Sequence, residues 1–414
     1  MKNSFLLLTF LLTMTCHNIA IARDFDQFDV ITEIHNFNKK VAENSQESFN
    51  EKLDAMSADL FSFMRGSAHL MNRDLQKASS LELLRTAPPG MVAGDLHMHN
   101  FSIAKSGNRQ AIYAIDDLDE AYANAPLSFD IFRLSVSLLT AYEKELAQKD
   151  QENLVKQLCA GYSDRAANPE TYEWPEMPKS EFIKNFIADE SDVKWSKFIK
   201  KRTSQTSPNS FNYEKYSQVS EQETLLVKTA LNNWFSTMQG ISADQAEILD
   251  ISQRFDKGLS SIGLKRYFVL LQGESKEWQD DCIVEVKQMR PSSIGSPTIV
   301  LQQQATIEAM KRAHQGLDPF LGSLVIGNDT FLARQNFPWS ETIENSTTTN
   351  QQHIMELAYT LGFVTADFHA HEKKGTEMKL WLEKHADTFI PMIFSYVKQL
   401  KADYKTFSER NKHE

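Results

Sequence analysis

Two stretches organise this chain, Met91-Val-Ala-Gly-Asp-Leu-His-Met-His-Asn-Phe101 and Ala111-Ile-Tyr-Ala-Ile-Asp-Asp-Leu-Asp-Glu120. The apolar runs 91–93 and 111–115 are typical of short β-strands, and each leads into acidic residues. Carboxylates gathered without neighbouring bases repel one another unless a cation or a metal-bound phosphate neutralises them. The pattern therefore predicts one functional site to which both strands contribute acids, an amide and imidazoles.

Length and composition narrow the class of protein. The chain has 414 residues, of which 41% are hydrophobic and 24% charged. These values are typical of a globular protein with two or three domains, or with one large two-lobed unit. The net charge is -11, and no basic stripe interleaved with aromatic residues is present. Nucleic-acid binding is therefore not expected.

The first 22 residues have the pattern of a signal peptide. Lys2 precedes an apolar run from Phe5 to Met14, and Ala20-Ile-Ala22 forms a small-x-small cleavage site. The run is shorter than the roughly 20 apolar residues that span a bilayer, and no later segment is long enough either. We therefore expect an exported protein, periplasmic or secreted, with no stable membrane span. Cys159 and Cys282 then form either one disulfide or two buried thiols.

Periodicity divides the remaining chain into three parts. Residues 23–250 are mainly helical, residues 251–340 are rich in β-formers, and residues 341–414 form closing helices. Within the β-rich part, 264–273 and 282–287 are expected to pair as a hairpin, and 324–334 as another around Asn328-Asp329. A helix over 302–315 carries Glu308. The fold class is therefore α+β, mostly helical with a small β-rich lobe.

The β-rich part carries a second chemical signal. Gly258 and Gly263 bound a turn, and the strand at 282–287 ends in Lys287. Such glycines let backbone N–H groups approach phosphates, and a strand lysine neutralises them. Glycines also occur in ordinary hairpin turns, so this signal alone is weak. Asp95, Asn100 and Asp117 supply the carboxylate and metal-ligand set that phosphoryl transfer requires, in the matching order.

These motifs also carry a resemblance. Gly94-Asp-Leu-His-x-x-Asn100 resembles the catalytic loop of aminoglycoside phosphotransferases and other kinase-like enzymes, and Asp117-Leu-Asp119 resembles their metal-binding segment. From about residue 55 to 375 the chain resembles more closely the bacterial family called domain of unknown function 2252. The shared motifs are Phe61-Ser-Phe-Met-Arg-Gly66, 94–101, 117–120, 130–134, 258–267, 286–292, 333–335 and 368–370.

The resemblance implies a two-lobed, protein-kinase-like fold that uses Mg and ATP. The catalytic loop precedes the glycine loop, so the domain must be circularly permuted. Asp95 takes the role of the catalytic base. The implied metal ligands are Asn100, Asp117, Asp116 and Asp119. The implied nucleotide-binding residues are Gly258, Ser261, Gly263, Lys287, Arg65 and Arg334, with Glu308 as the helix partner of Lys287.

The sequence leaves three functions open. A kinase-like phosphotransferase or nucleotidyltransferase would act from a nucleotide onto an unknown hydroxyl acceptor, either a small molecule or a protein. A metal-dependent hydrolase would use His97 and His99, which lie on one face of an extended segment, with His369, His371 or Asp367 as further ligands. A non-catalytic, ligand-binding pseudo-kinase is the third possibility, because exported proteins meet little ATP.

Overall fold

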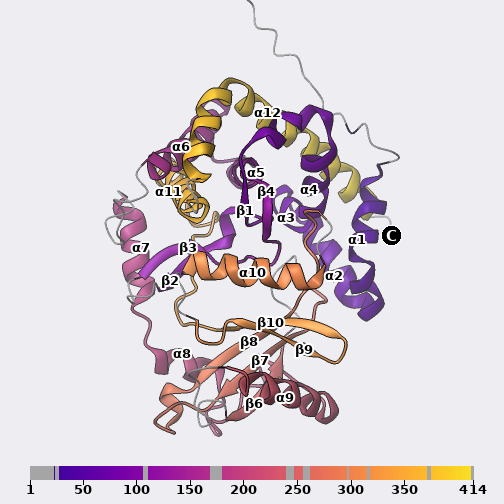
Figure 1. Cartoon of the computed structure of the whole chain (residues 1–414), viewed down its shortest axis with the longest axis vertical. Coiled ribbons are helices and arrows are strands. Elements are labelled where there is room, and N and C mark those ends of the chain that lie inside the picture. The colour runs from indigo at the N-terminus through magenta and orange to yellow at the C-terminus, as the bar shows by residue number, and fades with distance from the viewer. Residues whose placement is uncertain are drawn as a thin grey trace, which may run out of the picture.

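The structure is a computed structural model that describes residues 23, 28–105, 111–167, 180–238, 247–254, 262–295, 298–314, 318–370 and 374–411. It has two bodies, a helical body and a sheet body, with one helix between them (Figure 1). Among the described residues, no helix has both the length and the apolar character needed to cross a membrane. The expected signal peptide, residues 1–22, lies outside the described residues.

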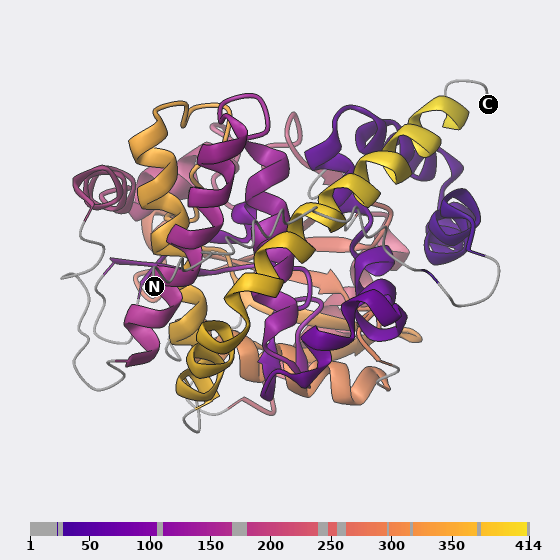
Figure 2. The same ribbon diagram turned by 90° about the horizontal axis from the view of Figure 1, so that it is seen from above.

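The helical body contains both ends of the described chain. Its N-terminal elements are α1 (Val30–Asn44), α2 (Gln46–Ser57), α3 (Leu60–Gly66), α4 (Ala68–Lys77), α5 (Ser128–Ala141), α6 (Gln148–Ala167) and α7 (Glu181–Ser191). Its C-terminal elements are α11 (Gln351–His369) and α12 (Lys374–Asn411). Viewed from above, α12 runs across the outside of this body (Figure 2).

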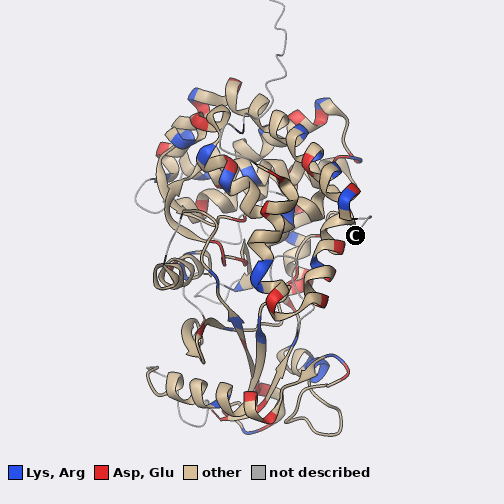
Figure 3. Cartoon of the chain, turned by 90° about the vertical axis from the view of Figure 1, so that its right-hand side faces the viewer, with Lys and Arg blue, Asp and Glu red and all other residues tan. Residues whose placement is uncertain are grey.

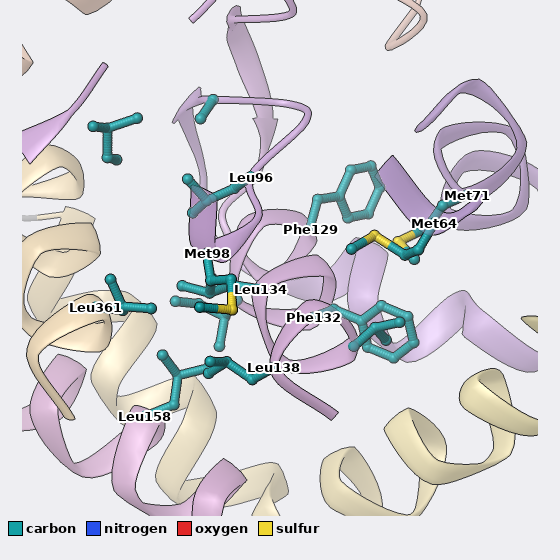
Figure 4. Packing of buried hydrophobic residues seen from close by; sticks show 14 of the residues in the cluster. Met64, Met71, Leu96, Met98, Phe129, Phe132, Leu134, Leu138, Leu158 and Leu361 are labelled. Carbon is teal, nitrogen blue, oxygen red and sulfur yellow. The ribbon is translucent and has the colours of Figure 1, made fainter. Parts of the chain in front are cut away.

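Helix α5 forms the centre of the helical body. Every residue from Ser128 to Ala141 is buried, as expected of a helix that is apolar on most sides. Leu134 and Leu138 pack near Leu158 of α6 and Leu361 of α11 (Figure 4). The α6 and α11 backbones cross closely, since a Cβ on Gly362 would lie 2.0 Å from the Leu158 carbonyl oxygen. Only glycine permits that approach.

Two small two-stranded antiparallel sheets carry the organising motifs. Strand β1 (Pro89–Val92) pairs with β4 (Tyr122–Pro126), and β2 (Phe101–Lys105) pairs with β3 (Ala111–Ile115). The expected strand at 111–115 is therefore confirmed. The acidic segment 116–120 lies between β3 and β4, and the Gly94 to Asn100 loop lies between β1 and β2. Both segments consequently lie at the same side of the helical body.

The sheet body is a six-stranded antiparallel sheet in the order β5-β6-β7-β8-β10-β9. Its strands are β5 (Ser217–Gln218), β6 (Ile248–Gln253), β7 (Arg266–Leu271), β8 (Cys282–Gln288), β9 (Gly322–Ile326) and β10 (Asp329–Gln335). Both predicted hairpins, β7 with β8 and β9 with β10, are confirmed. The α+β class, mostly helical, is confirmed as well.

Alternation along β8 gives the sheet two different faces. Val284 and Val286 are buried toward α9 (Glu221–Phe235), which contributes Val227, Leu231 and Phe235 to one core. Ile283, Glu285 and Lys287 lie on the other face, because side chains alternate along a strand. Part of that face packs on α8 (Trp195–Arg202). The remainder, with its charged residues, faces the helical body, where Lys287 pairs with Asp119 and Arg334 with Asp116. Basic segments of the strands lie at the end of the sheet nearest the helical body (Figure 3).

The sheet body begins earlier than the expected boundary at residue 251. Strand β6 starts at Ile248, and α8 and α9 pack on the sheet rather than on the helical body. Local periodicity marked 150–250 as helical without showing which core those helices would cover. Helix α10 (Ile299–His314) lies between the bodies, and its Ala309 and Met310 join the helical core.

Candidate functional site

The loop that begins at Gly94 is fixed by backbone geometry and by one buried acid. Gly94 has φ +81°, and a Cβ there would lie 2.2 Å from the Glu120 carbonyl oxygen, so the position requires glycine. The Asp130 carboxylate of α5 accepts hydrogen bonds from the N–H groups of Ala93 at 2.7 Å and Gly94 at 3.0 Å. This carboxylate thereby holds the turn that presents Asp95.

A buried polar chain supports Asp130 from behind. His369 Nε2 of α11 lies 3.1 Å from the Asp130 carboxylate, and His369 Nδ1 lies 3.1 Å from the Tyr162 hydroxyl of α6. The close crossing of α6 and α11 is what brings these side chains together. His369, one of the zinc ligands considered above, is therefore a structural partner of Asp130.

Asp95 is buried against a cation. It forms an ion pair with Arg133 of α5, whose side chain is 1% exposed and also donates to the Met64 carbonyl oxygen at 3.2 Å. Burial raises the pKa of Asp95 to about 6, and the Arg133 charge only partly offsets that effect. A carboxylate with this pKa can accept a proton near neutral pH, as a general base must.

Asn100 braces the loop internally. Its side-chain oxygen accepts a hydrogen bond from the His97 N–H at 2.7 Å, and its carbonyl oxygen accepts one from the Asp116 N–H at 2.7 Å. The loop from Gly94 to Asn100 and the acidic segment 116–120 are thus joined by a direct hydrogen bond. Asn100 is buried and reaches the acidic segment through its own carbonyl oxygen, whereas its side chain is turned back onto the loop.

Lys287 of β8 reaches across from the sheet body to the acidic segment. It forms an ion pair with Asp119, although 168 positions separate the two residues. Asp95, Asp117, Asp119, Glu120, Lys287 and Arg290 line one small recess, which we call the acidic recess. Burial disfavours the charged form of Asp117, but Lys287, Arg334 and Arg266 outweigh it and hold the pKa of Asp117 below its usual value. Asp117 is therefore ionised where Lys287 is close.

A larger cavity of about 470 Å³ opens beside the acidic recess. We call it the arginine cavity, since Arg266 of β7 and Arg334 of β10 lie on its wall around Glu285 of β8. Glu285 pairs with Arg334 at 3.0 Å and Arg266 at 3.3 Å. Burial alone would raise the pKa of Glu285, but these arginines lower it to about 2. Glu285 is thus a permanent anion in the cavity wall.

Comparison with known protein families shows which family the chain belongs to. The family model described as "Uncharacterized protein conserved in bacteria (DUF2252)" matches residues 45–410. The chain belongs to the DUF2252 family. No curated protein and no solved structure matches it.

Asp116 and Asp117 face different spaces in this DUF2252 protein. Asp116 lines the arginine cavity, where it pairs with Arg334 at 3.0 Å and lies 3.7 Å from His314 Nε2 of α10. Asp117 lines the acidic recess with Asp119. The structure therefore does not bring Asp116 to the place where a metal shared with Asp117 was expected.

The expected pair between Lys287 and Glu308 is not formed. Glu308 is exposed on α10 and bonds to Arg312 at 2.9 Å, one turn away on the same helix. Packing decides this, because α10 turns Gln302, Ala309 and Met310 inward. Gln302 instead donates to the Asp119 carbonyl oxygen at 2.7 Å. The helix residue that contacts the acidic segment is therefore an amide and not a carboxylate.

The remaining candidates are placed as follows. Arg65 of α3 is largely buried, and burial lowers its pKa even though Asp95, Glu344 and Asp117 act on it electrostatically. Gly263 lies against Val41 of α1. Gly258 and Ser261 lie outside the described residues, as does His371.

Among the described residues, His97 and His99 are not arranged with other side chains as ligands of one metal ion. Their ring centroids lie 6.4 Å apart, and burial, together with Arg65, lowers the pKa of both rings, that of His99 to about 4. Asp367, a further candidate zinc ligand, pairs with Arg165. In the described part of the chain, no group of three or more His, Cys, Asp or Glu residues could hold a metal ion.

Sequence reasoning overlooked the cations that neutralise the acids. Arg133 lies in the shared motif at 130–134, but no role was predicted for it. Arg290 pairs with Glu120 at 3.1 Å, and Lys52 of α2 is fully buried near Asp95 and Glu120, where burial lowers its pKa to about 7. Lys52 lies in an ordinary amphipathic helix, so no local signal marks it.

Proposed function

We propose that this protein transfers a phosphoryl or nucleotidyl group from a nucleotide to a hydroxyl-bearing acceptor, with Mg²⁺. One observation carries the proposal: Lys287 of the sheet body lies in the same recess as Asp95, Asp117 and Asp119 of the helical body. Phosphoryl transfer requires such a set, with a cation on the phosphates, carboxylates on the metal and a carboxylate at the acceptor.

The pKa values support a division of roles between the two central carboxylates. The pKa of Asp95 is raised to about 6, whereas that of Asp117 is held below its usual value. When the environments of two carboxylates push their pKa values apart in this way, one carboxylate often acts as a base and the other remains permanently charged. In the proposed reaction Asp95 would take the acceptor proton, and Asp117 and Asn100 would hold Mg²⁺, which would neutralise the charge on the phosphates and on the departing part of the nucleotide. Lys287 would leave Asp119 and bind phosphate oxygens.

The arrangement of the sheet supports a kinase-like interpretation. In protein kinases a glycine-rich loop covers the phosphates, and the phosphate-binding lysine lies on the third strand, ahead of a helix. Here β6 and β7 flank the segment with Gly258 and Gly263, Lys287 lies on β8, and α10 follows. The sheet interrupts the helical body in the sequence, so the order of the lobes is that of a circular permutant.

The proposal is tested by thermal unfolding of the mature protein with Mg-nucleotide. Binding to the folded state alone raises the melting temperature. We expect the rise to disappear in Lys287→Met and in Asp117→Asn, while Lys265→Met, an exposed lysine of the same body, keeps it. If wild type shows no rise with any Mg-nucleotide, but binds one zinc ion that His97→Ala/His99→Ala loses, the hydrolase replaces this proposal.

A ligand-binding role is the second candidate, and a specific observation favours it. Lys287 and Asp119 neutralise each other directly, and no metal-ligand cluster is assembled among the described residues. A pocket closed in this way can bind a nucleotide without turning it over. Nucleotide binding that is unchanged in Asp95→Asn, with no transfer to any acceptor, would favour this second role.

We also propose export of the protein, on the pattern of residues 2–22. Cleavage after Ala22 leaves Arg23 first, and its guanidinium lies between Asp74 at 2.7 Å and Asp403 at 2.7 Å. N-terminal sequencing of the protein from a periplasmic or culture fraction should begin at Arg23. A chain that keeps Met1 in the cytoplasmic fraction would contradict export.

A further inference from the structure

The arginine cavity is rich in hydrogen-bond donors and poor in free acceptors. Cationic side chains in its wall are Lys105, Arg202, Arg266, Lys311 and Arg334, and the carboxylates are Asp116, Glu285 and Asp318. Each carboxylate already has partners: Asp318, for example, accepts from the N–H groups of Phe320 and Gln335, both at 2.8 Å. A ligand that fits this wall must present acceptors to it.

The two central arginines keep donors for such a ligand. Arg266 approaches Glu285 through Nη1, and Arg334 uses Nε and Nη1 on Glu285 and Asp116. Among the contacts of the described residues, Nε and Nη2 of Arg266 and Nη2 of Arg334 have no partner. Because an arginine carries five N–H donors, each of these side chains can still bind a second acceptor.

Strand β8 connects this cavity to the acidic recess. Glu285 lines the arginine cavity and Lys287 lines the acidic recess, and the two side chains lie on the same face of one strand. A nucleotide whose phosphates bind Lys287 would therefore extend its base toward Arg266 and Arg334. The cavity volume of about 470 Å³ lies within the range of small-molecule sites.

We propose that the arginine cavity selects a guanine base over an adenine base, an inference that rests on the proposed function. Guanine presents two adjacent acceptors, O6 and N7, and arginine binds that edge with two hydrogen bonds. Adenine presents a donor, the N6 amino group, in place of O6, so a wall of arginines meets it donor to donor.

The test compares Mg-GTP and Mg-ATP binding by calorimetry in wild type, Arg266→Met and Arg312→Met. We expect GTP to bind wild type at least about tenfold more tightly than ATP, the ratio of one well-placed bidentate contact. Arg266→Met should remove most of that preference, and Glu285 keeps Arg334 as a partner in this variant. Arg312, which pairs with Glu308 on the outer side of α10, is the matched control and should keep the preference.

The outcomes separate this inference from the proposed function. Equal binding of GTP and ATP, or tighter binding of ATP, overturns the guanine preference and leaves the phosphotransferase proposal in place. A preference for GTP that persists in Arg266→Met also overturns it, since another group would then read the base. Binding of neither nucleotide overturns the proposed function and, with it, this inference.

Discussion

Buried polar pairs inside the helical body differ from the ion pairs between the two bodies. The side chains of Asp130 and His369 are 1% and 0% exposed. His369 bonds to Asp130, and Asp130 accepts hydrogen bonds from the backbone N–H groups at the start of the loop from Gly94 to Asn100. Arg334 and Asp116, which join the sheet body to the helical body, are 27% and 30% exposed. Buried partners are expensive to remove, whereas exposed pairs contribute little. The loop is therefore preassembled by one body, and weaker contacts add the other half of the site.

Removing the buried acid should have the largest effect. Asp130→Asn replaces one acceptor by an N–H₂ group that faces backbone N–H donors, and it leaves His369 without its carboxylate. We expect a loss of about 3 kcal/mol in the free energy of unfolding, measured by urea denaturation. Asp189→Asn, an exposed acid of α7, is the control. A loss below about 0.5 kcal/mol would contradict preassembly by this pair.

The same loop should lose stability in mild acid through His99. Burial and Arg65 lower its pKa to about 4, although the Glu344 carboxylate lies 3.1 Å from His99 Nε2. The unfolded chain therefore binds the proton more readily than the folded one. The stability from a neutral His99 is present above about pH 6.5 and is lost as the pH falls toward 4, which amounts to about 3 kcal/mol.

This contribution is measured by comparing wild type with His99→Gln at several pH values. The variant should lose less stability than wild type between pH 6.5 and 4, and His353→Gln serves as the control for removing one histidine. Parallel pH curves for wild type and His99→Gln would show that His99 can be protonated without disturbing the loop.

The contact between the bodies should be weaker and sensitive to salt. A double-mutant cycle with Arg334→Met and Asp116→Asn isolates their coupling from the bonds that each makes elsewhere. We expect about 1 kcal/mol, falling in 1 M salt because the pair is partly exposed. A coupling of about 3 kcal/mol that salt does not change would mean that the two bodies are joined as firmly as the loop itself.

The thiols should show no effect of reduction. Cys159 belongs to the helical body and Cys282 to the sheet body, both are free, and burial raises the pKa of both thiols, that of Cys159 to about 12. A reductant should leave the melting temperature unchanged, and both thiols, which are half-buried, should react with a thiol reagent faster after unfolding than before. A drop in melting temperature with reductant would indicate that the bodies are cross-linked.

The sequence predicted features within each body better than contacts between segments that are far apart in the chain. The β-formers from Cys282 to Lys287 predicted a strand that ends in Lys287, and the structure confirms that strand. The structure brings Asp95 and Asp117 to one recess, whereas Asn100 does not line it and bonds to His97 and Asp116. Glu308 failed as the partner of Lys287 because the inward face of α10 depends on packing against β3 and β4, which spacing does not show. Arg133, Arg290 and Lys52 were missed for a similar reason, since only the fold brings these distant cations to the acids.

The proposed function requires Lys287 and Asp117 to act on one nucleotide, although they belong to different bodies. Calorimetric titration of Mg-nucleotide into wild type, Lys287→Met, Asp117→Asn and the double variant tests it most directly. We expect each single change to weaken binding at least about tenfold, and the double change to cost much less than the product of the two, because Lys287 and the Mg²⁺ held by Asp117 would bind the same phosphates. Wild-type affinity in either single variant, or fully independent effects, would contradict it.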